Sequence, residues 1–477
     1  MGVGLAYLLL LIPEPQPPAP AGAGKSPFAW NRDDFWTSLE KQFLEMKQLG
    51  CEELEPRINE SLSEIQRTFD VLATSKLAPD DPAFDRLEAG IFNMALMVCA
   101  CPKRMPDLMQ VFSRMRLVVK RQSELWPQDS AAGRARLYRS LYGGRAAVEQ
   151  AMLQSGGSSL ELPLVELDEP SLAPSAVVRG VTVRSGDILV SRGGAATSAL
   201  IARGNDFTGN FSHIALVHID QATRAVSVIE AHIESGVVVA PIEKYLSDTK
   251  LRIMGLRLRS DHPAVRADPL LPHKAATHAL EAATARHIPY DFAMDYKEPG
   301  KQFCSEVASS AYERQGVKLW MHLSYLSTPG LTSWLSVLGV RRFETQEPSD
   351  LEYDPQVRVI AEWRDPETLF NDHADNAVID VMLERAEAGE PLDYNLWLLP
   401  VVRLVKAWSV LNNWCGVVGP VPEGMSATTA LRAQRIAARH AEIKKRLLAS
   451  AKKFKAENGY TPPYWVLLRL AREAQSQ

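Results

Sequence analysis

The chain has 477 residues, of which 46% are hydrophobic and 23% charged, and this composition excludes collagen-like, rod-like and wholly disordered proteins. Its 53 Lys and Arg against 57 Asp and Glu leave a net charge of −4, so the whole molecule is no general polyanion binder and we expect no nucleic-acid partner. Five cysteines are few and odd in number, which predicts no disulfide framework and at least one free thiol.

The first 28 residues allow two interpretations. An apolar run, Gly4–Ile12, precedes a proline-rich stretch and Ala21-Gly22-Ala23, which resembles a signal-peptidase site. However, no Lys or Arg precedes Lys25, whereas secretory signals begin with a basic region. A leader for export to the cell envelope or periplasm and a disordered cytoplasmic leader therefore both stay open.

Residues 29–155 have the apolar periodicity of helices. One stripe shows spacings of 4, 4, 3, 4 and 3: Leu54, Ile58, Leu62, Ile65, Phe69 and Leu72. Similar stripes follow over residues 87–101, 108–119 and 137–148, and the short loops between them predict an antiparallel helical bundle. Cys99 and Cys101 lack a second metal-spaced pair, so we expect them to pack in the core.

We expect a linker over residues 156–182 and an α+β domain over 183–345. Runs rich in Val, Ile and Leu predict strands, and two helices follow them: strands Asp187–Ser191, Ile214–Ile219, Ala225–Glu230, Gly236–Pro241 and Arg252–Leu258, then helices Pro272–His287 and Ser305–Gln315. Strands first and helices afterwards indicate an α+β arrangement rather than alternating βαβ units.

From about Glu347 the pattern is helical again, and residues 346–477 are assigned to a helical C-terminal domain. The apolar segment Trp397–Leu411 is either a buried helix or an interfacial membrane element. Residues 431–477 carry 11 Lys and Arg against 3 Glu, a balance of +8, with a narrow apolar stripe: Ile436, Ile443, Leu447 and Phe454. This basic amphipathic helix is either a solvated face or docks on an anionic membrane or polymer.

Three residues of the middle domain supply the parts of a cysteine nucleophile. His213 begins an apolar strand and Glu230 ends the next one, so antiparallel pairing would bring the carboxylate to the imidazole. Cys304 stands where an irregular stretch becomes a helix, whose N-terminal partial positive charge is expected to stabilise the thiolate.

In this arrangement the thiolate attacks a carbonyl carbon, while His213 takes the thiol proton and later protonates the leaving group. Glu230 fixes the imidazole tautomer, and the backbone N–H of Cys304 is a natural oxyanion donor.

Neighbouring residues offer alternatives. His232 lies two residues after Glu230, on the same strand face, and is either a substrate contact or the true orienting residue. Ser212 is a further candidate for the substrate cleft. His218 is an odd number of residues from His213 on the same strand, so its side chain is expected to face the other side of the sheet. Glu306 lies in the first turn of the cysteine helix and is expected to cap it.

The series GDILVSR, FSHIALV, VIEAHIE, YDF and FCSEVASSAY resembles the YaeF/YiiX-like permuted papain-like amidases. These bacterial enzymes belong to the NlpC-type cell-wall peptidase superfamily, whose permuted branch includes the lecithin:retinol acyltransferase-like proteins. In the permuted group the histidine strand and the acidic residue precede the cysteine helix, as here. The resemblance covers about Ser185–Trp320.

This resemblance implies a circularly permuted papain-like fold with Cys304 as the nucleophile, His213 as the base and Glu230 as the orienting third residue. Tyr290 matches an aromatic position ahead of the nucleophile and is expected to line the cleft. The helical segments at either end lie outside the shared motifs.

Three functions are compatible with these residues. The first is a thiol hydrolase that cleaves an amide or isopeptide bond, including bonds in cell-wall peptides. The second is a lipid-directed acyl hydrolase or acyltransferase, which the basic tail, Trp397, Trp408 and Trp414 motivate. The third is an interaction protein without turnover.

We expect neither a cofactor nor a metal. The stretch APAGAGKS imitates a phosphate-binding loop, but prolines stand where that loop needs a strand before it and a helix after it. His273, His278 and His287 lack metalloprotease spacing, which disfavours a zinc hydrolase.

Overall fold

The computed structural model describes residues 7–15, 25–30, 33–127, 130–155, 164–165, 169–415 and 417–476. Ala21-Gly22-Ala23 lies outside the described residues, as does most of the predicted linker before residue 169. Among the described helices, none combines the length and the apolar character needed to cross a bilayer.

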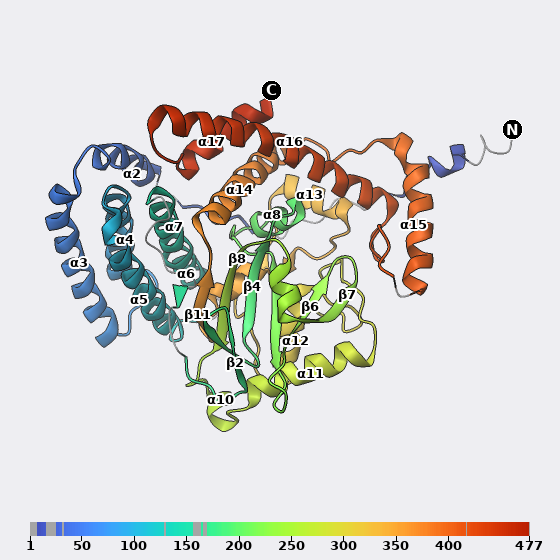
Figure 1. Ribbon diagram of the computed structural model, residues 1–477, viewed down its shortest axis with the longest axis horizontal. Helices are drawn as coiled ribbons and strands as arrows, with labels where there is room; N and C mark the ends of the chain where they lie inside the picture. The colour runs from blue at the N-terminus through green and yellow to red at the C-terminus, as the bar shows by residue number, and fades with distance from the viewer. Residues whose placement is uncertain are drawn as a thin grey trace.

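An antiparallel sheet lies at the centre of the described chain (Figure 1). Its seven strands follow the order β1-β11-β8-β4-β5-β6-β7: β1 Leu164–Val165, β4 Ile188–Gly193, β5 His213–Ile219, β6 Val226–His232, β7 Gly236–Pro241, β8 Lys250–Leu258 and β11 Val357–Trp363. The five predicted strands match β4 to β8 to within two residues at each end. The predicted α+β fold class is confirmed.

Strand β11 corrects the expectation that the chain is helical from Glu347 onward. It lies between β1 and β8, and six of its seven residues are buried. Because both faces are covered, no apolar alternation marks this strand in the sequence. Its polar members are paired instead, Arg358 with Glu124 and Glu362 with Arg116. The sheet therefore extends beyond the predicted boundary at residue 345.

A hairpin occupies the end of the predicted linker. Strands β2 (Ser175–Val178) and β3 (Val181–Arg184) pair antiparallel. The turn between them is Arg179-Gly180, and both residues have positive φ angles, as the tightest hairpin turns require.

The N-terminal helices form one apolar core, in agreement with the predicted periodicity. They are α2 Asp33–Met46, α3 Cys51–Thr74, α4 Pro82–Ala100, α5 Met105–Ser123, α6 Ala131–Leu137, a π-helical segment Tyr138–Gly143 and α7 Gly144–Gln154. In the predicted stripe of α3, Leu62 is half-buried and the other five members are buried.

Cys51 and Cys101 form a disulfide, which corrects the expectation of unpaired cysteines in this region. Cys51 is the first residue of α3 and Cys101 follows the last residue of α4. The packing of these two helices brings their ends together, and periodicity along one helix carries no information about that distance. Cys99 is buried and free, as expected.

Each face of the sheet is covered. Helices α11 (Leu271–Ala285) and α12 (Cys304–Glu313) pack on the face that carries Ile188, Ile214 and Leu216. The β2–β3 hairpin and α9 (Ile242–Ser247) cover the opposite face. Shorter elements complete this region: α10 Pro263–Ala267, β9 Ser324–Tyr325 and β10 Glu344–Thr345.

A further apolar core joins middle and C-terminal helices: α8 Ala196–Arg203, α13 Pro329–Leu338, α14 Pro366–Glu387, α16 Ala427–Asn458 and α17 Tyr464–Ser476. Ile436, Ile443 and Leu447 are buried in it, and Phe454 is half-buried. The apolar stripe of the basic helix α16 therefore faces the protein.

Helix α15 (Leu399–Trp414) differs from these elements. It stands at the edge of the molecule in Figure 1, away from the sheet, and most of its large apolar side chains are exposed. The interpretation of this segment as a buried helix is wrong.

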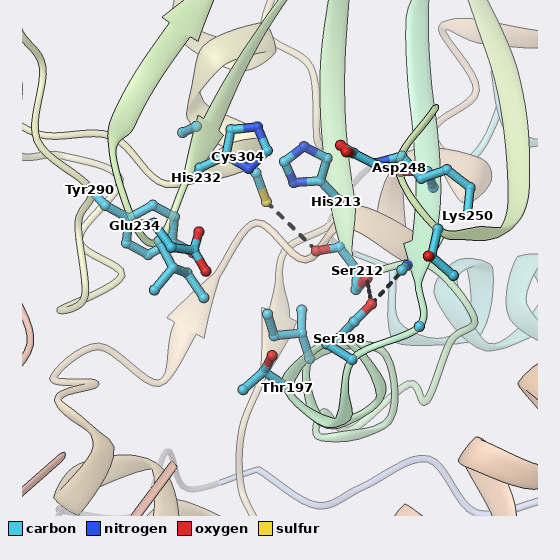
Figure 2. A pocket seen from close by; sticks show the side chains of 18 residues that line it. Thr197, Ser198, Ser212, His213, His232, Glu234, Asp248, Lys250, Tyr290 and Cys304 are labelled. Carbon is cyan, nitrogen blue, oxygen red and sulfur yellow. Dashed lines mark hydrogen bonds and ion pairs between the residues drawn. The ribbon is translucent and has the colours of Figure 1, made fainter. Parts of the chain in front are cut away.

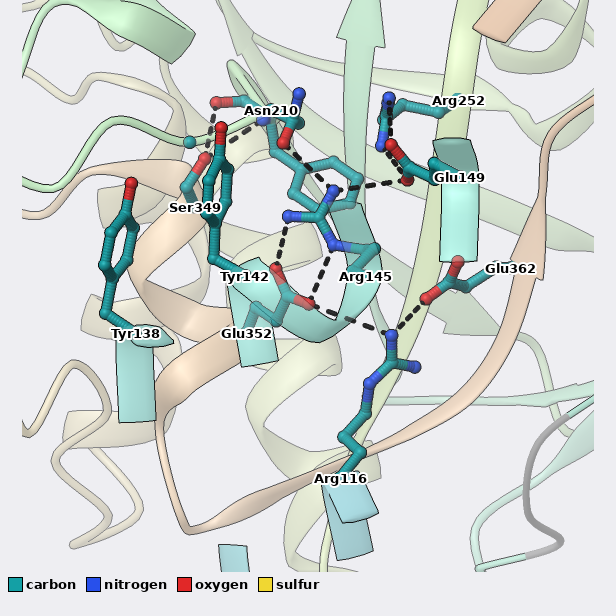
Figure 3. A network of polar contacts seen from close by, with 12 residues as sticks. Arg116, Tyr138, Tyr142, Arg145, Glu149, Asn210, Arg252, Ser349, Glu352 and Glu362 are labelled. Atoms are coloured by element: carbon teal, nitrogen blue, oxygen red, sulfur yellow. Dashed lines mark hydrogen bonds and ion pairs between the residues drawn. The ribbon is translucent and has the colours of Figure 1, made fainter. Parts of the chain in front are cut away.

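A buried ionic network connects the N-terminal helices to the sheet (Figure 3). Arg145 of α7 binds both carboxylate oxygens of Glu352, at 3.0 and 2.9 Å. Arg116 of α5 binds Glu362 of β11 at 2.6 Å, and Glu149 of α7 binds Arg252 of β8. All six side chains are at most 4% exposed.

Candidate active site

The first two site residues lie on neighbouring antiparallel strands. In the β5–β6 register, Ala215 is opposite Glu230, and His213 is two residues before Ala215, so both site side chains lie on one face of the sheet. The imidazole Nε2 of His213 is 2.6 Å from Oε2 of Glu230. The predicted approach of this carboxylate to this imidazole is present in the structure.

Glu230 is shared by a second histidine. Nε2 of His232 lies 3.1 Å from the other carboxylate oxygen, and the rings of His213 and His232 are 5.4 Å apart. Both histidines therefore contact Glu230, one at each carboxylate oxygen, and Glu230 lies between them.

Cys304 is the first residue of α12 and lines the same cavity as His213 (Figure 2). The cavity has a volume of about 560 Å³. The thiol lies 3.9 Å from the carbonyl oxygen of Ser212, to which it donates, and among the described residues it makes no hydrogen bond to an imidazole. Catalytic hydrogen bonds are often absent in unliganded enzymes and form only when substrate binds, so this arrangement is compatible with a role for both residues.

The pKa values of the three groups around the carboxylate differ. Burial opposes the ionised form of Glu230, but the hydrogen bonds from His213 and His232 outweigh burial and hold its pKa well below the usual range. Burial lowers the pKa of His213, although Glu230 opposes that effect. The hydrogen bond to Glu230 raises the pKa of His232. At neutral pH this arrangement favours an ionised Glu230 and a neutral His213.

The thiol does not follow the expectation from the sequence. Burial raises the pKa of Cys304 to about 12, so the desolvation of its charged form outweighs the helix N-terminus. This raised pKa favours a neutral thiol in the unliganded protein at neutral pH. Cys415 is the exposed free cysteine among those described.

Tyr290 lines the cavity, as expected from the family resemblance. Its segment is paired with the chain that leads to Cys304, because Tyr290 bridges Gln302 and the N–H of Asp291 donates to the carbonyl of Gln302 at 3.2 Å. The ring packs edge-on against Phe292 at 5.1 Å. This pairing fixes the position of Tyr290 relative to Cys304.

Ser212 also lines the cavity. Its N–H donates to the carbonyl of Ser191 at 2.9 Å, which ties the start of β5 to β4, and its hydroxyl contacts that of Ser198. Ser198 was not predicted, nor were the charged residues Glu234 and Lys250, which lie on different sides of the cavity in Figure 2. The signal available for Glu234 and Lys250 was their place at the ends of strands next to the candidate site, whereas Ser198 lies within α8.

The expectations for His218 and Glu306 agree with the structure. His218 faces away from the cavity and stacks on His273 of α11, with ring centroids 5.5 Å apart. Glu306 caps α12, because its carboxylate accepts the N–H of Phe303 at 2.8 Å. Burial raises the pKa of Glu306 to about 8.

One donor set could hold a metal ion. The ligand atoms of His213, Glu230 and His232 lie within 4.8 Å of one another. Two imidazoles and one carboxylate are a set that zinc accepts, so experiments on this site need a chelator control.

Residues 182–361 match the family described as permuted papain-like amidase enzyme, YaeF/YiiX, C92 family. No curated protein matches the chain. The matched range begins in β3 and ends in β11, so it includes the sheet from β4 to β8, both candidate-site strands and the cysteine helix. Papain-like amidases are cysteine hydrolases. Over residues 182–361, this match confirms the resemblance to the permuted papain-like amidase family.

Proposed function

We propose that this protein hydrolyses an amide or isopeptide bond through a thioester on Cys304, with His213 as the base and Glu230 as the residue that orients it. The observation that carries the proposal is the 2.6 Å contact between His213 and Glu230 at a cavity that Cys304 also lines. The His213–Glu230 contact without Cys304, or Cys304 without that contact, would not favour a catalytic role over a structural one.

The tautomer of His213 follows from this contact. Because Glu230 is ionised, Nε2 of His213 carries the proton and donates it to the carboxylate, and Nδ1 keeps a free electron pair. Nδ1 takes the Cys304 proton as the sulfur attacks the carbonyl carbon, and the imidazolium then gives that proton to the leaving amine. Water hydrolyses the thioester in the second half-reaction and releases the acid and the free thiol.

The oxyanion of each tetrahedral intermediate needs donors. The N–H of Cys304 is the first of α12, where the helix has no carbonyl to accept it, and the helix dipole favours negative charge at this end. Because burial raises the pKa of Cys304, the proposed mechanism has the thiol lose its proton to His213 as the sulfur attacks, rather than before substrate binds.

Two substrate classes are compatible with the cavity. Polar side chains line it, including Glu234 and Lys250, and these suit a peptide with its own charged groups, such as a cell-wall peptide. An acyl-lipid substrate is the second candidate, favoured by the exposed tryptophans of helix α15.

The test is capture of the acyl-enzyme. The protein is incubated with peptide amides, isopeptides, muropeptides and acyl-lipids, quenched in acid and measured by intact-protein mass spectrometry, with peptide mapping of the adduct. We expect an acyl adduct on Cys304 with one substrate class, and none in Cys304→Ala. Cys415→Ala, which removes an exposed thiol remote from the cavity, is the matched control and should form the adduct normally.

A chelator arm separates thiol from metal chemistry. Turnover that persists in Cys304→Ala and stops with chelator would move the activity to His213, Glu230 and His232 as metal ligands. No turnover and no adduct with any substrate class would leave the domain as a binding module.

A further inference from the structure

An exposed apolar stripe runs along helix α15 and begins at Trp397, two residues before the helix. Its members are 4, 3, 4, 3 and 3 residues apart and are between 52% and 85% exposed: Trp397, Val401, Leu404, Trp408, Leu411 and Trp414. We call this the α15 face. Isolated apolar side chains are common on protein surfaces, but five on one side of one helix, with Trp397 just before its first residue, mark a contact surface.

The N-terminal segment extends this face. Residues 7–10 are helical and lie beside α15 in Figure 1. The Tyr7 hydroxyl donates to the carbonyl of Trp397 at 2.9 Å, and Arg403 donates to the carbonyls of Leu10 and Ile12 at 2.9 and 2.7 Å. The neighbouring side chains of this segment, Leu8 and Leu9, are exposed and enlarge the same apolar surface.

Cations outnumber acids around the α15 face, where the nearby acids are Glu14, Asp393 and Glu423. The sequence from Leu396 to Val418 contains no Asp or Glu and two cations, Arg403 and Lys406. Helix α16, which packs beside α15, carries nine Lys and Arg against two Glu. A hollow of about 440 Å³ separates the start of α15 from α16 and is lined by Leu398, Tyr394 and the exposed Arg435, with one acid, Asp393.

We propose that the α15 face docks on a lipid surface that carries anionic headgroups. Exposed Trp and Leu side chains on one side of a helix, bordered by cations, are the pattern of interfacial helices, in which aromatic rings sit at headgroup level. The basic side of α16 adds attraction to anionic lipid. Three tryptophans among six positions suit this interface better than a packed helix pair, which favours aliphatic side chains.

The docking face has a fixed position relative to the cavity. Lys406 of α15 donates to the carbonyl of Glu423 at 2.7 Å, and the Glu423 carboxylate pairs with His287 at 2.8 Å. Next to it, Gly424 approaches the ring of Phe292 so closely that a Cβ would meet it at 2.6 Å, and Phe292 packs on Tyr290. A lipid surface at α15 would thus hold the cavity in one orientation.

The experiment is co-sedimentation of the full chain with vesicles of phosphatidylcholine alone and with added phosphatidylglycerol. We expect binding to the anionic vesicles, weakening as salt is raised, and a blue shift of tryptophan emission with quenching by brominated lipid. The double variant Leu404→Glu/Trp408→Glu should lower the vesicle affinity by at least about tenfold. Leu172→Glu, at a site 75% exposed in another region, is the matched control and should bind normally.

Two results would overturn the proposal. One is absence of vesicle binding, or binding that the double variant leaves unchanged. The other is concentration-dependent self-association in sedimentation velocity that the double variant abolishes without any vesicle binding, since the face would then pair two copies of this chain. Cys304→Ala should bind vesicles like the wild type, so failure of docking and failure of the proposed hydrolysis are distinguished.

Discussion

The cavity and the interior network of Figure 3 both hold buried carboxylates, but they neutralise them in different ways. Glu230 is held by two imidazoles, groups that gain and lose protons near neutral pH. Glu352 is held by the guanidinium of Arg145, which stays charged throughout the accessible pH range. The first arrangement can move a proton and the second can only hold parts together. Glu149 of the network also contacts an imidazole, that of His373 at 3.2 Å, but three arginines pair with the same carboxylate. A buried carboxylate held by imidazoles without arginine therefore distinguishes the candidate site from the network.

The largest effect should come from the groups that exchange protons. Cys304→Ala and His213→Ala should each lower the hydrolysis rate by on the order of 10⁴-fold or more, because each removes a member of a unit that acts together. The free energy of unfolding, measured in urea, should change by less than about 2 kcal/mol. Wild-type turnover in either variant would contradict the assignment.

Replacing the shared carboxylate should have the next largest effect. Glu230→Gln keeps the shape but loses the charge, and we expect a fall in kcat of roughly 10²-fold to 10⁴-fold with the fold intact. His232→Ala should cost less, since the contact to His213 remains. The reverse order, with His232→Ala inactive and Glu230→Gln active, would transfer the orienting role to His232.

The interior network should show the opposite response. Arg145→Ala leaves Glu352 buried and short of its bidentate partner, which should lower the free energy of unfolding by about 3–5 kcal/mol in urea denaturation. The kcat of the folded fraction should stay at the wild-type value. The double variant Arg145→Met/Glu352→Leu removes both charges and should recover much of the loss. A fall in kcat without a fall in stability would mean that the network contributes to the cavity.

The smallest effect concerns pH. Burial lowers the pKa of His213, so the neutral base persists below the ordinary histidine value, and the acid limb of kcat/KM should lie below about pH 6.5. Glu230 raises that pKa against burial, so its loss in Glu230→Gln should move the acid limb to still lower pH. A limb above pH 6.5, or one that moves upward in the variant, would show that another group controls the rate.

The sequence alone predicted the strands β4 to β8 and the meeting of His213 with Glu230, because chain order and strand parity determine which face a residue takes. It did not predict strand β11, whose buried charges hide any period, or the disulfide between Cys51 and Cys101, which depends on how two helices pack. The raised pKa of Cys304 was also missed, since desolvation depends on neighbours from the whole domain. The local sequence pattern therefore predicted the strands and the site residues, whereas the pKa of Cys304 depends on packing between segments far apart in the chain.

Strand β11 has a consequence for how the enzyme is made. During synthesis β8 emerges with one edge paired to β4 and the other edge open, and it stays an exposed template for aggregation until β11 arrives about a hundred residues later. The hydroxyl of Ser349, just before β11, also bonds both the N–H and the carbonyl of Phe211 at the base of the His213 strand. Cys304 is thus translated before the segment that completes its surroundings, and a nascent chain that ends after Cys304 holds an unfinished candidate site.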